Sequence, residues 1–255
     1  TLVLNIRDAF VSAGPLAIVA VAGVVLAYWW LNPNPPTEVR LATGPAQSAY
    51  AGFGDQYRAA LASNKIRVDL KESEGSFNNL QMLRDEQTDL AFVQGGTASL
   101  TDDDLESFTS LGALFVEPVW LFYRSDAVKR INRQNALHSL TDLRGWRINV
   151  GTAGSGVPTL FTNLPDANHV QPNLLTLSHL TETPATVDFL AGKIDAMVFV
   201  SAPESLMVQM LLQTPGVQLM DFPQHEAYGR KFKFLTPVTL PRGIVDLANN
   251  VPPQD

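Results

Sequence analysis

The feature that most constrains this chain is an uncharged stretch near its N-terminus. Residues 9–37 contain no Asp, Glu, Lys or Arg, and residues 13–31 are mostly apolar. A helix of about 19 apolar residues is long enough to cross the hydrocarbon core of a bilayer. The stretch ends in Tyr28, Trp29 and Trp30, whose amphipathic rings suit the depth of the lipid headgroups. We therefore predict one transmembrane helix over residues 13–31.

Two other interpretations of this helix stay open. Residues 25–27 have the small-residue pattern of a signal-peptide cleavage site, so the segment could instead be removed after export. It could also be a buried helix of a soluble protein, although Gly14, Pro15 and Gly23 are poor residues for such a helix. Arg7 is the only basic residue on the short side, so charge gives little indication of orientation.

Beyond the prolines that follow this helix, short apolar runs alternate with helical patterns, which predicts an α/β fold. The segments 85–93 and 191–199 resemble each other, because in each a helix end, a turn and an Asp precede an apolar strand. This similarity predicts two lobes of the same plan. Predicted strands cover 39–43, 66–71, 89–93, 147–150, 174–177 and 195–200, and a long extended stretch covers 111–123. The predicted parts of the chain are a short N-terminal segment (1–12), the transmembrane helix (13–31), a Pro-rich linker (32–37), lobe 1 (38–118), lobe 2 (119–222) and a segment that returns toward lobe 1 (223–255).

Open α/β sheets bind ligands at the carboxyl ends of their strands, so the loops there are the candidate site. Glu74-Gly75-Ser76 joins a predicted strand to a helix, and the glycine-rich loop 151–156 repeats this arrangement in the second lobe. Unpaired N–H groups at a helix start attract a carboxylate or a phosphate. The alternative is that Ser76 simply caps its helix.

Several function classes are disfavoured by what the sequence lacks. The chain has no Cys, and its four His residues are dispersed, so we predict no disulfide, no metal site and no cofactor. No nucleophile elbow, Walker loop or dinucleotide fingerprint occurs, and we predict that the chain is not an enzyme. A net charge of −7 without a basic cluster argues against nucleic acid as a partner.

Three stretches of the first lobe form a recognisable set: residues 41–44 followed by Tyr50, the helix start at 74–80, and the strand at 88–96. They resemble the TAXI family, the solute receptors of tripartite ATP-independent periplasmic (TRAP) transporters. In the second lobe, residues 143–156 and 192–196 are similar to the family's pattern. The resemblance covers about residues 38–250. It implies a two-lobed fold of the periplasmic-binding-protein type II kind.

The chain departs from the family pattern at three places. Receptors of this family commonly have a cleavable signal, whereas this chain resembles a subgroup with an uncleaved helix. Residues 44–50 lack the usual paired glycines before the tyrosine. The family's chain also continues past a segment like 239–243 to a further strand and helices, so we expect the sheet of lobe 1 to be incomplete.

Together these features predict a receptor that captures a small carboxylate between two lobes and delivers it to a membrane permease. We expect it at the inner membrane as a single-pass protein, with its globular part in the periplasm or on the extracellular side. A membrane-tethered sensor that signals to a partner, and an α/β enzyme acting on a small acid, are the alternatives. Glu117 and Trp120 lie near the predicted crossing between lobes and could shape the cleft. The candidate ligand-binding residues are Ser48, Tyr50, Gly75, Ser76, Asn79, Gln94, Thr152, Ser155 and Ser201.

Overall fold

The computed structural model describes residues 2–31, 36–46, 48–97 and 100–253; for residues 2–13 and 172 it describes the backbone only. The chain forms two compact units, Thr1–Thr37 and Glu38–Asp255. Most of the predicted Pro-rich linker, including Pro33 and Pro35, lies outside the described residues, as does Gln47 of the first loop.

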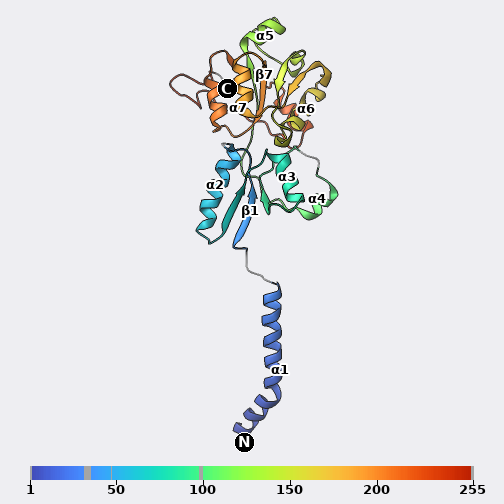
Figure 1. The fold of residues 1–255 in the computed structure, drawn as a ribbon, viewed down its shortest axis with the longest axis vertical. Coiled ribbons are helices and arrows are strands. Elements are labelled where there is room, and N and C mark those ends of the chain that lie inside the picture. Colours follow the sequence, from blue (N-terminus) through green and yellow to red (C-terminus); the bar gives the residue numbers. More distant parts are fainter. Residues whose placement is uncertain (1, 32–35, 47, 98–99, 254–255) are drawn as a thin grey trace. The chain divides into compact units, whose positions relative to one another are not determined.

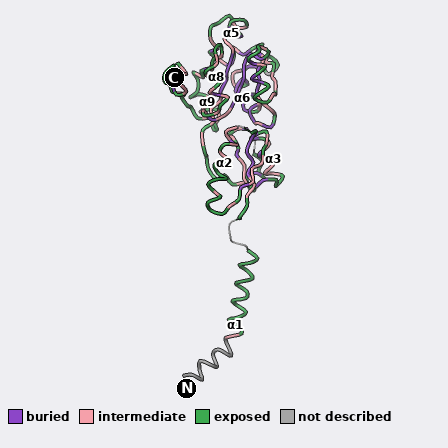
Figure 2. Tube along the Cα trace, turned by 60° about the vertical axis from the view of Figure 1, so that its left-hand side comes forward, coloured by how far each residue is buried: buried purple, intermediate pink, exposed green. Residues whose placement is uncertain are grey.

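The first unit contains the helix α1, which covers Leu2–Leu31 and so begins ahead of the predicted start at residue 13. Its window Gly14–Leu31 has a mean hydropathy of 1.9, and none of the window is buried (Figure 2). This helix is therefore long and apolar enough to cross a membrane. A membrane anchor and a signal sequence near the N-terminus both meet this criterion of length and composition, so both interpretations stay open.

The second unit contains two α/β lobes (Figure 1). In lobe 1, the central strand β1 pairs in parallel with β2 on one side and β3 on the other. Its helices α2, α3 and α4 follow these strands in turn. The elements of lobe 1 are β1 (Glu38–Ala42), α2 (Ala49–Ala62), β2 (Arg67–Lys71), α3 (Ser76–Arg84), β3 (Leu90–Ala91) and α4 (Asp102–Ser107).

Lobe 2 repeats this plan and extends it. Its central parallel strand β5 lies between β6 and β7, and β4 then pairs antiparallel with both β7 and β8, which gives the order β6-β5-β7-β4-β8. The shared order confirms the predicted α/β fold with two lobes of similar plan. The elements are β4 (Val119–Arg124), α5 (Ser125–Ile131), η1 (Leu140–Leu143), β5 (Arg147–Asn149), η2 (Ala153–Ser155), α6 (Val157–Ala167), η3 (Pro172–Leu174), β6 (Thr176–Ser178), α7 (Glu182–Leu190), β7 (Ala196–Val200), α8 (Leu206–Gln213) and β8 (Val217–Leu219).

Two predicted strands differ from the structure. The third strand of lobe 1, predicted over 89–93, is limited to Leu90–Ala91, where it pairs with β1. The extended stretch predicted over 111–123 is a strand only from Val119, and residues 108–118, called here the crossing segment, are in neither helix nor strand. Pro118 has no N–H to give to a strand ladder, which fits the start of β4 directly after it.

The chain beyond lobe 2 contains α9 (His225–Lys231) and an isolated bridge between Asp246 and Val251. Leu235 and Leu240 pack against buried clusters of lobe 2. A Cβ atom at Gly96, in lobe 1, would lie 2.4 Å from the ring of Phe234. The segment 223–255 therefore has contacts in both lobes, and its function as a return to lobe 1 stays a prediction.

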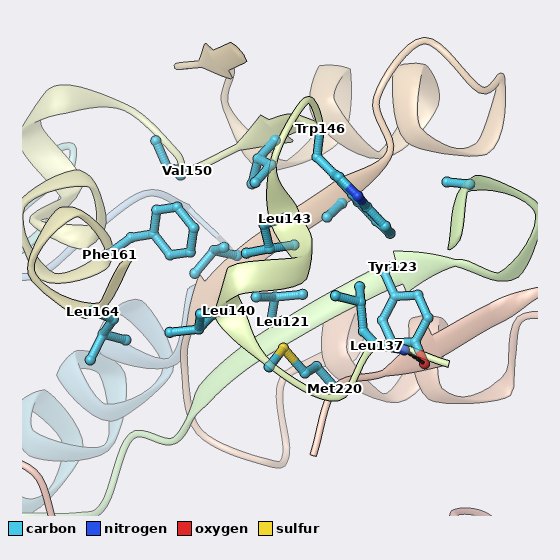
Figure 3. Close-up of a cluster of buried hydrophobic side chains, with 14 of the residues drawn as sticks. Leu121, Tyr123, Leu137, Leu140, Leu143, Trp146, Val150, Phe161, Leu164 and Met220 are labelled. Atoms are coloured by element: carbon cyan, nitrogen blue, oxygen red, sulfur yellow. Dashed lines mark hydrogen bonds between the residues drawn. The ribbon is translucent and has the colours of Figure 1, made fainter. Parts of the chain in front are cut away.

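The two lobes have cores of different size. The largest buried cluster lies in lobe 2, where Phe161 and Leu164 of α6 and the fully buried Trp146 surround the sheet face formed by Leu121 and Tyr123 (Figure 3). A second cluster covers the other face of that sheet. The cluster of lobe 1 consists of Leu41, Tyr50, Val68 and Phe92, with partly buried side chains around them.

An Arg–Asp pair joins β1 to the start of β3 in lobe 1, and an equivalent pair joins β5 to the start of β7 in lobe 2. In lobe 1, the backbone N–H and the guanidinium of Arg40 donate to the carboxylate of Asp89, at 2.7 to 3.1 Å. In lobe 2, Arg147 makes the equivalent bonds to Asp195, at 2.7 to 3.1 Å, and Arg130 adds another at 2.6 Å. The two Asp residues are those singled out by the sequence repeat.

The two pairs differ in how deeply the Asp side chain is buried. The side chain of Asp195 is 2% exposed, whereas that of Asp89 is 43% exposed. Burial opposes ionisation of Asp195, but the hydrogen bonds and charge of Arg147 outweigh it and hold the pKa of Asp195 below its usual value. The pKa of Asp89 is lowered by its hydrogen bonds to Arg40.

We predict that Asp195→Asn lowers the free energy of unfolding by about 2–3 kcal/mol at pH 7, because a buried carboxylate that accepts charge-assisted hydrogen bonds from Arg147 and Arg130 is lost. The matched variant Asp89→Asn should cost less than about 1 kcal/mol, because solvent screens its pair. Both pKa values are lowered by folding, so the pairs stabilise the fold above about pH 4 and this contribution is lost as the pH falls below it. Urea unfolding at pH 7 and at pH 3 measures both effects. Equal losses for the two variants at pH 7 would contradict this account.

Candidate functional site

The loops of lobe 1 converge on the hydroxyl of Ser76, at the start of α3. The phenol of Tyr50 lies 3.2 Å from Ser76 Oγ, and the backbone N–H of Gln94 donates to the same oxygen at 3.0 Å. The phenol also donates to Glu117 Oε2 at 2.6 Å. Ser76 and Tyr50 are buried. The structure therefore brings three of the predicted site residues into one hydrogen-bond network.

Asn79, another of the predicted ligand-binding residues, is bonded to the ends of two strands. Its side chain is fully buried, and its amide donates to the backbone carbonyls of Thr43 and of Phe92, the latter at 2.8 Å. Its carbonyl accepts from the Ser73 hydroxyl at 2.5 Å. Thr43 follows β1 and Phe92 follows β3, so Asn79 connects the carboxyl ends of both strands to α3. These bonds explain why an Asn occupies this helical position.

In lobe 2, residues 152–156 form a tight turn that contains η2. The backbone carbonyl of Thr152 accepts from the N–H of Ser155 at 3.1 Å and from its hydroxyl at 2.7 Å. The Ser155 hydroxyl in turn accepts from the N–H of Val157 at 3.3 Å. Gly156 has φ +84°, a left-handed conformation that favours glycine. The Ser155 hydroxyl is thus bonded within its own turn, and the turn leads directly into α6.

The two lobes touch where these loops meet, and we call this contact the seam. The N–H of Gly154 donates to Glu74 Oε2 at 3.2 Å. A Cβ atom at Gly75 would lie 2.9 Å from the Cα of Ser155, and one at Gly156 would lie 2.6 Å from the Cβ of Thr97. The backbones can approach this closely because glycine carries no side chain. Two predicted site residues, Gly75 and Ser155, therefore face each other across the lobes.

Three other predicted site residues lie outside this network. Ser48 caps α2, where its side chain accepts from the N–H of Ala51 at 3.2 Å. Thr152 precedes η2 and makes no side-chain capping bond. The carbonyl of Ser201 accepts from the indole N–H of Trp120 at 2.9 Å, so Trp120 is a buried core residue whose polar atom is satisfied. Whether these three contact a solute stays a prediction.

Sequence reasoning missed Glu74 and Thr97 as parts of the site. Glu74 belongs to the loop that the sequence singled out, and Thr97 follows the Gly95-Gly96 turn. The sequence signal that could have found both residues is their place in the loops that follow the carboxyl ends of strands. Nothing local in the sequence indicates that they meet the glycine turn of the other lobe, because that contact depends on how the lobes close.

A cavity of about 1320 Å³ opens beside β3. Most of its lining is apolar, and includes Phe92 of lobe 1 and Leu160 of lobe 2. Tyr50, Gln94 and Glu117 supply polar groups to its wall. Concave, mostly apolar spaces with a few polar groups are typical of small-molecule sites. Among the described residues, no group of three acidic or His side chains is placed to hold a metal ion.

Glu117 is the titratable group of this network whose pKa is moved to near neutral pH. Burial raises the pKa of Glu117 to about 7, although the hydrogen bond from Tyr50 acts in the opposite direction. Burial and the adjacent Glu117 carboxylate both raise the pKa of Tyr50, which therefore stays a neutral phenol. Near neutral pH the Glu117 carboxyl exchanges between its two protonation states.

We predict that protonation of Glu117 gives the protein a pH-dependent stability. Because folding raises this pKa from its usual value of 4.5, the contribution is complete below about pH 4.5 and is lost as the pH rises through 7, by up to about 3 kcal/mol. Glu117→Gln should remove this part of the pH dependence, and Tyr50→Phe should move it to higher pH. Urea unfolding between pH 4.5 and pH 8 measures it.

The free energy of unfolding at each pH must be compared as the difference between the variant and the parent, because burial also raises the pKa of Glu182, which therefore titrates in both proteins. A Glu117→Gln profile that runs parallel to the parent over the whole range would show that Glu117 does not titrate as described.

Two α/β lobes with this strand order, joined by a chain that crosses between them, define the type II class of periplasmic binding proteins, which bind solutes between their lobes. The chain belongs to the NMT1-like family, whose sequence profile matches residues 41–252. This family is of the periplasmic solute-binding type. No curated protein matches the chain in sequence.

Solved structures share this fold at low sequence identity. An ancestral arginine-binding protein bound to arginine has a TM-score of 0.51 and 15% identity, over 73% of this chain and 80% of that one. The alkanesulfonate-binding protein SsuA from Xanthomonas axonopodis pv. citri, bound to MOPS, has a TM-score of 0.50 and 18% identity, over 74% and 61%. A protein from Bordetella bronchiseptica RB50 has a TM-score of 0.57 and 14% identity, over 77% and 60%. The chain spans less than two thirds of the latter two.

Proposed function

We propose that this chain captures a small anionic solute, a carboxylate such as a dicarboxylate, an oxo acid or an acidic amino acid, between its two lobes. The observation that carries the proposal is the hydrogen bond from the N–H of Gly154 to a carboxylate oxygen, that of Glu74. A backbone N–H in a glycine-rich turn binds anions because its dipole is held in a fixed direction. The same donor can bind the carboxylate of a solute when the lobes open and close on it.

The solute would lie among the predicted contact residues. Tyr50 and Gln94 of lobe 1 line the cavity, and both are bonded to the Ser76 hydroxyl. Thr152 and Ser155 belong to the turn of lobe 2, and Ser48 caps α2. Gly75 lets the backbones approach, and Ser201 follows β7. Asn79 would act indirectly, since its amide is bonded to two strand ends.

The proposed partner is a membrane permease of the TRAP type, to which the receptor would deliver its solute. The resemblance to TAXI receptors supports this part of the proposal, together with the solute-binding family. In this role α1 would hold the receptor at the inner membrane, with the globular unit in the periplasm or on the extracellular side. Its apolar window is long enough for a single crossing.

We expect a carboxylate to raise the melting temperature of the full chain in detergent. A ligand at 100 times its Kd stabilises the folded state by about 2.7 kcal/mol, which corresponds to roughly 5–10 °C for a domain of this size. Tryptophan fluorescence can follow the transition, because Trp120 and Trp146 are buried. A melting temperature that rises with a neutral or cationic solute, and with no carboxylate, would contradict the anionic specificity.

We also expect the full chain to remain in bacterial membranes after a carbonate wash, with an intact mass that includes α1. An apolar helix of this length binds the bilayer far more strongly than a peripheral contact. Protease added to spheroplasts should digest the globular unit if it faces outward. Recovery of a soluble periplasmic form that starts after Ala27 would show instead that α1 is a cleaved signal.

A further inference from the structure

Glu74 is an exposed residue whose side chain nevertheless has a defined partner in the other lobe. Its backbone N–H donates to Asn78 Oδ1 at 3.2 Å, which holds the loop before α3. Its carboxylate accepts from the N–H of Gly154 at 3.2 Å. The bond joins residues 80 positions apart in the sequence and crosses from lobe 1 to lobe 2. It is therefore a contact that exists only while the lobes are closed at the seam.

The space around Gly154 is filled by this side chain. A Cβ atom at Gly154 would lie 2.5 Å from Glu74 Oε2 and 2.6 Å from Glu74 Cβ. Next to it, Gly75 meets the backbone of Ser155. A second carboxylate cannot occupy the place of the Glu74 carboxylate while this contact is present, because atoms in a packed interface exclude one another.

We propose that Glu74 is a latch that closes the two lobes when no solute is bound, and that an anionic solute competes with its carboxylate for the N–H of Gly154. The second half of this inference rests on the proposed function. Glu74 is attached to the loop that faces the turn, so its effective concentration there is high, and a solute must overcome it. The apparent affinity for the solute is then the intrinsic affinity multiplied by the fraction of molecules that are not latched.

Glu72 provides a matched control in the same loop. It is also an exposed Glu, and its Oε1 accepts from a backbone N–H, that of Ala46, at 3.1 Å. This bond lies within lobe 1. Replacing Glu72 therefore removes a similar charge and a similar bond without changing the contact between lobes.

The closure of the lobes can be measured directly with spin labels, because the chain has no Cys. Ala59→Cys on α2 and Lys129→Cys on α5 place one label on an exposed site of each lobe. In the solute-free full chain, Glu74→Ala should broaden the distance distribution and move it to longer distances. Glu72→Ala should leave it unchanged. A Glu74→Ala distribution that superimposes on the parent overturns the latch.

Titration calorimetry with succinate, 2-oxoglutarate and L-glutamate tests the competition. For a probe that binds the parent, Glu74→Ala should lower the Kd about five- to tenfold, since a hydrogen bond to a charged group is lost from the competing state. Glu72→Ala should leave the Kd unchanged. Weaker binding in Glu74→Ala would mean that Glu74 contacts the solute, and would overturn the competition.

If the proposed function is wrong, the binding experiment gives a different result from the one that overturns the latch. If none of the probes binds the parent or Glu74→Ala, the carboxylate specificity is wrong, and the spin-label distances alone then decide whether Glu74 closes the lobes. Gly154→Ala offers a second route, because it crowds Glu74 with no left-handed φ at this position. It should separate the lobes as Glu74→Ala does, whereas Gly52→Ala on α2, with open space around it, should not.

Discussion

The arrangement of the loops in lobe 1 depends on the buried amide of Asn79, which connects the carboxyl ends of β1 and β3 to α3. Without it, neighbouring parallel strands far apart in the sequence would be held by few ladder bonds, since β3 contains two residues. With β1 and β3 side by side, the carbonyls of Thr43 and Phe92 come within reach of one amide, that of Asn79. Asn79 then fixes the start of α3, and α3 places Ser76 and the loop before it at the seam.

Much of this architecture could be predicted from local sequence patterns. The Asp before an apolar strand, repeated at Asp89 and Asp195, marks the third strand of both lobes, and the helix start at Ser76 is where the pattern places it. These signals are local, because strand alternation and helix starts depend on residues near each other in the chain. The two-lobed plan follows from their repetition.

The details of the site could not be predicted in the same way. The bonds from the amide of Asn79 to the strand ends could not be predicted, because every residue has a backbone carbonyl and the sequence pattern does not distinguish those that accept a bond. The Ser155 hydroxyl is bonded within its own turn. The contact of Glu74 with Gly154 depends on the closure of two separate lobes, which is a property of the whole unit and not of either loop. The shortness of β3 likewise depends on its neighbours in the sheet.

The crossing segment has a further consequence for how the lobes move. Its Phe115 stacks on Phe53 of α2, with ring centroids 4.2 Å apart, and packs on the small cluster of lobe 1. The segment is thus part of the core of one lobe and the tether to the other. Domain separation must bend the chain after Phe115, near Glu117 and Pro118, or expose this stack. Lobe 1, with its small core, then has the lower local stability, and its backbone amides would exchange with solvent faster than those of lobe 2. Solute binding and the local stability of lobe 1 are therefore coupled.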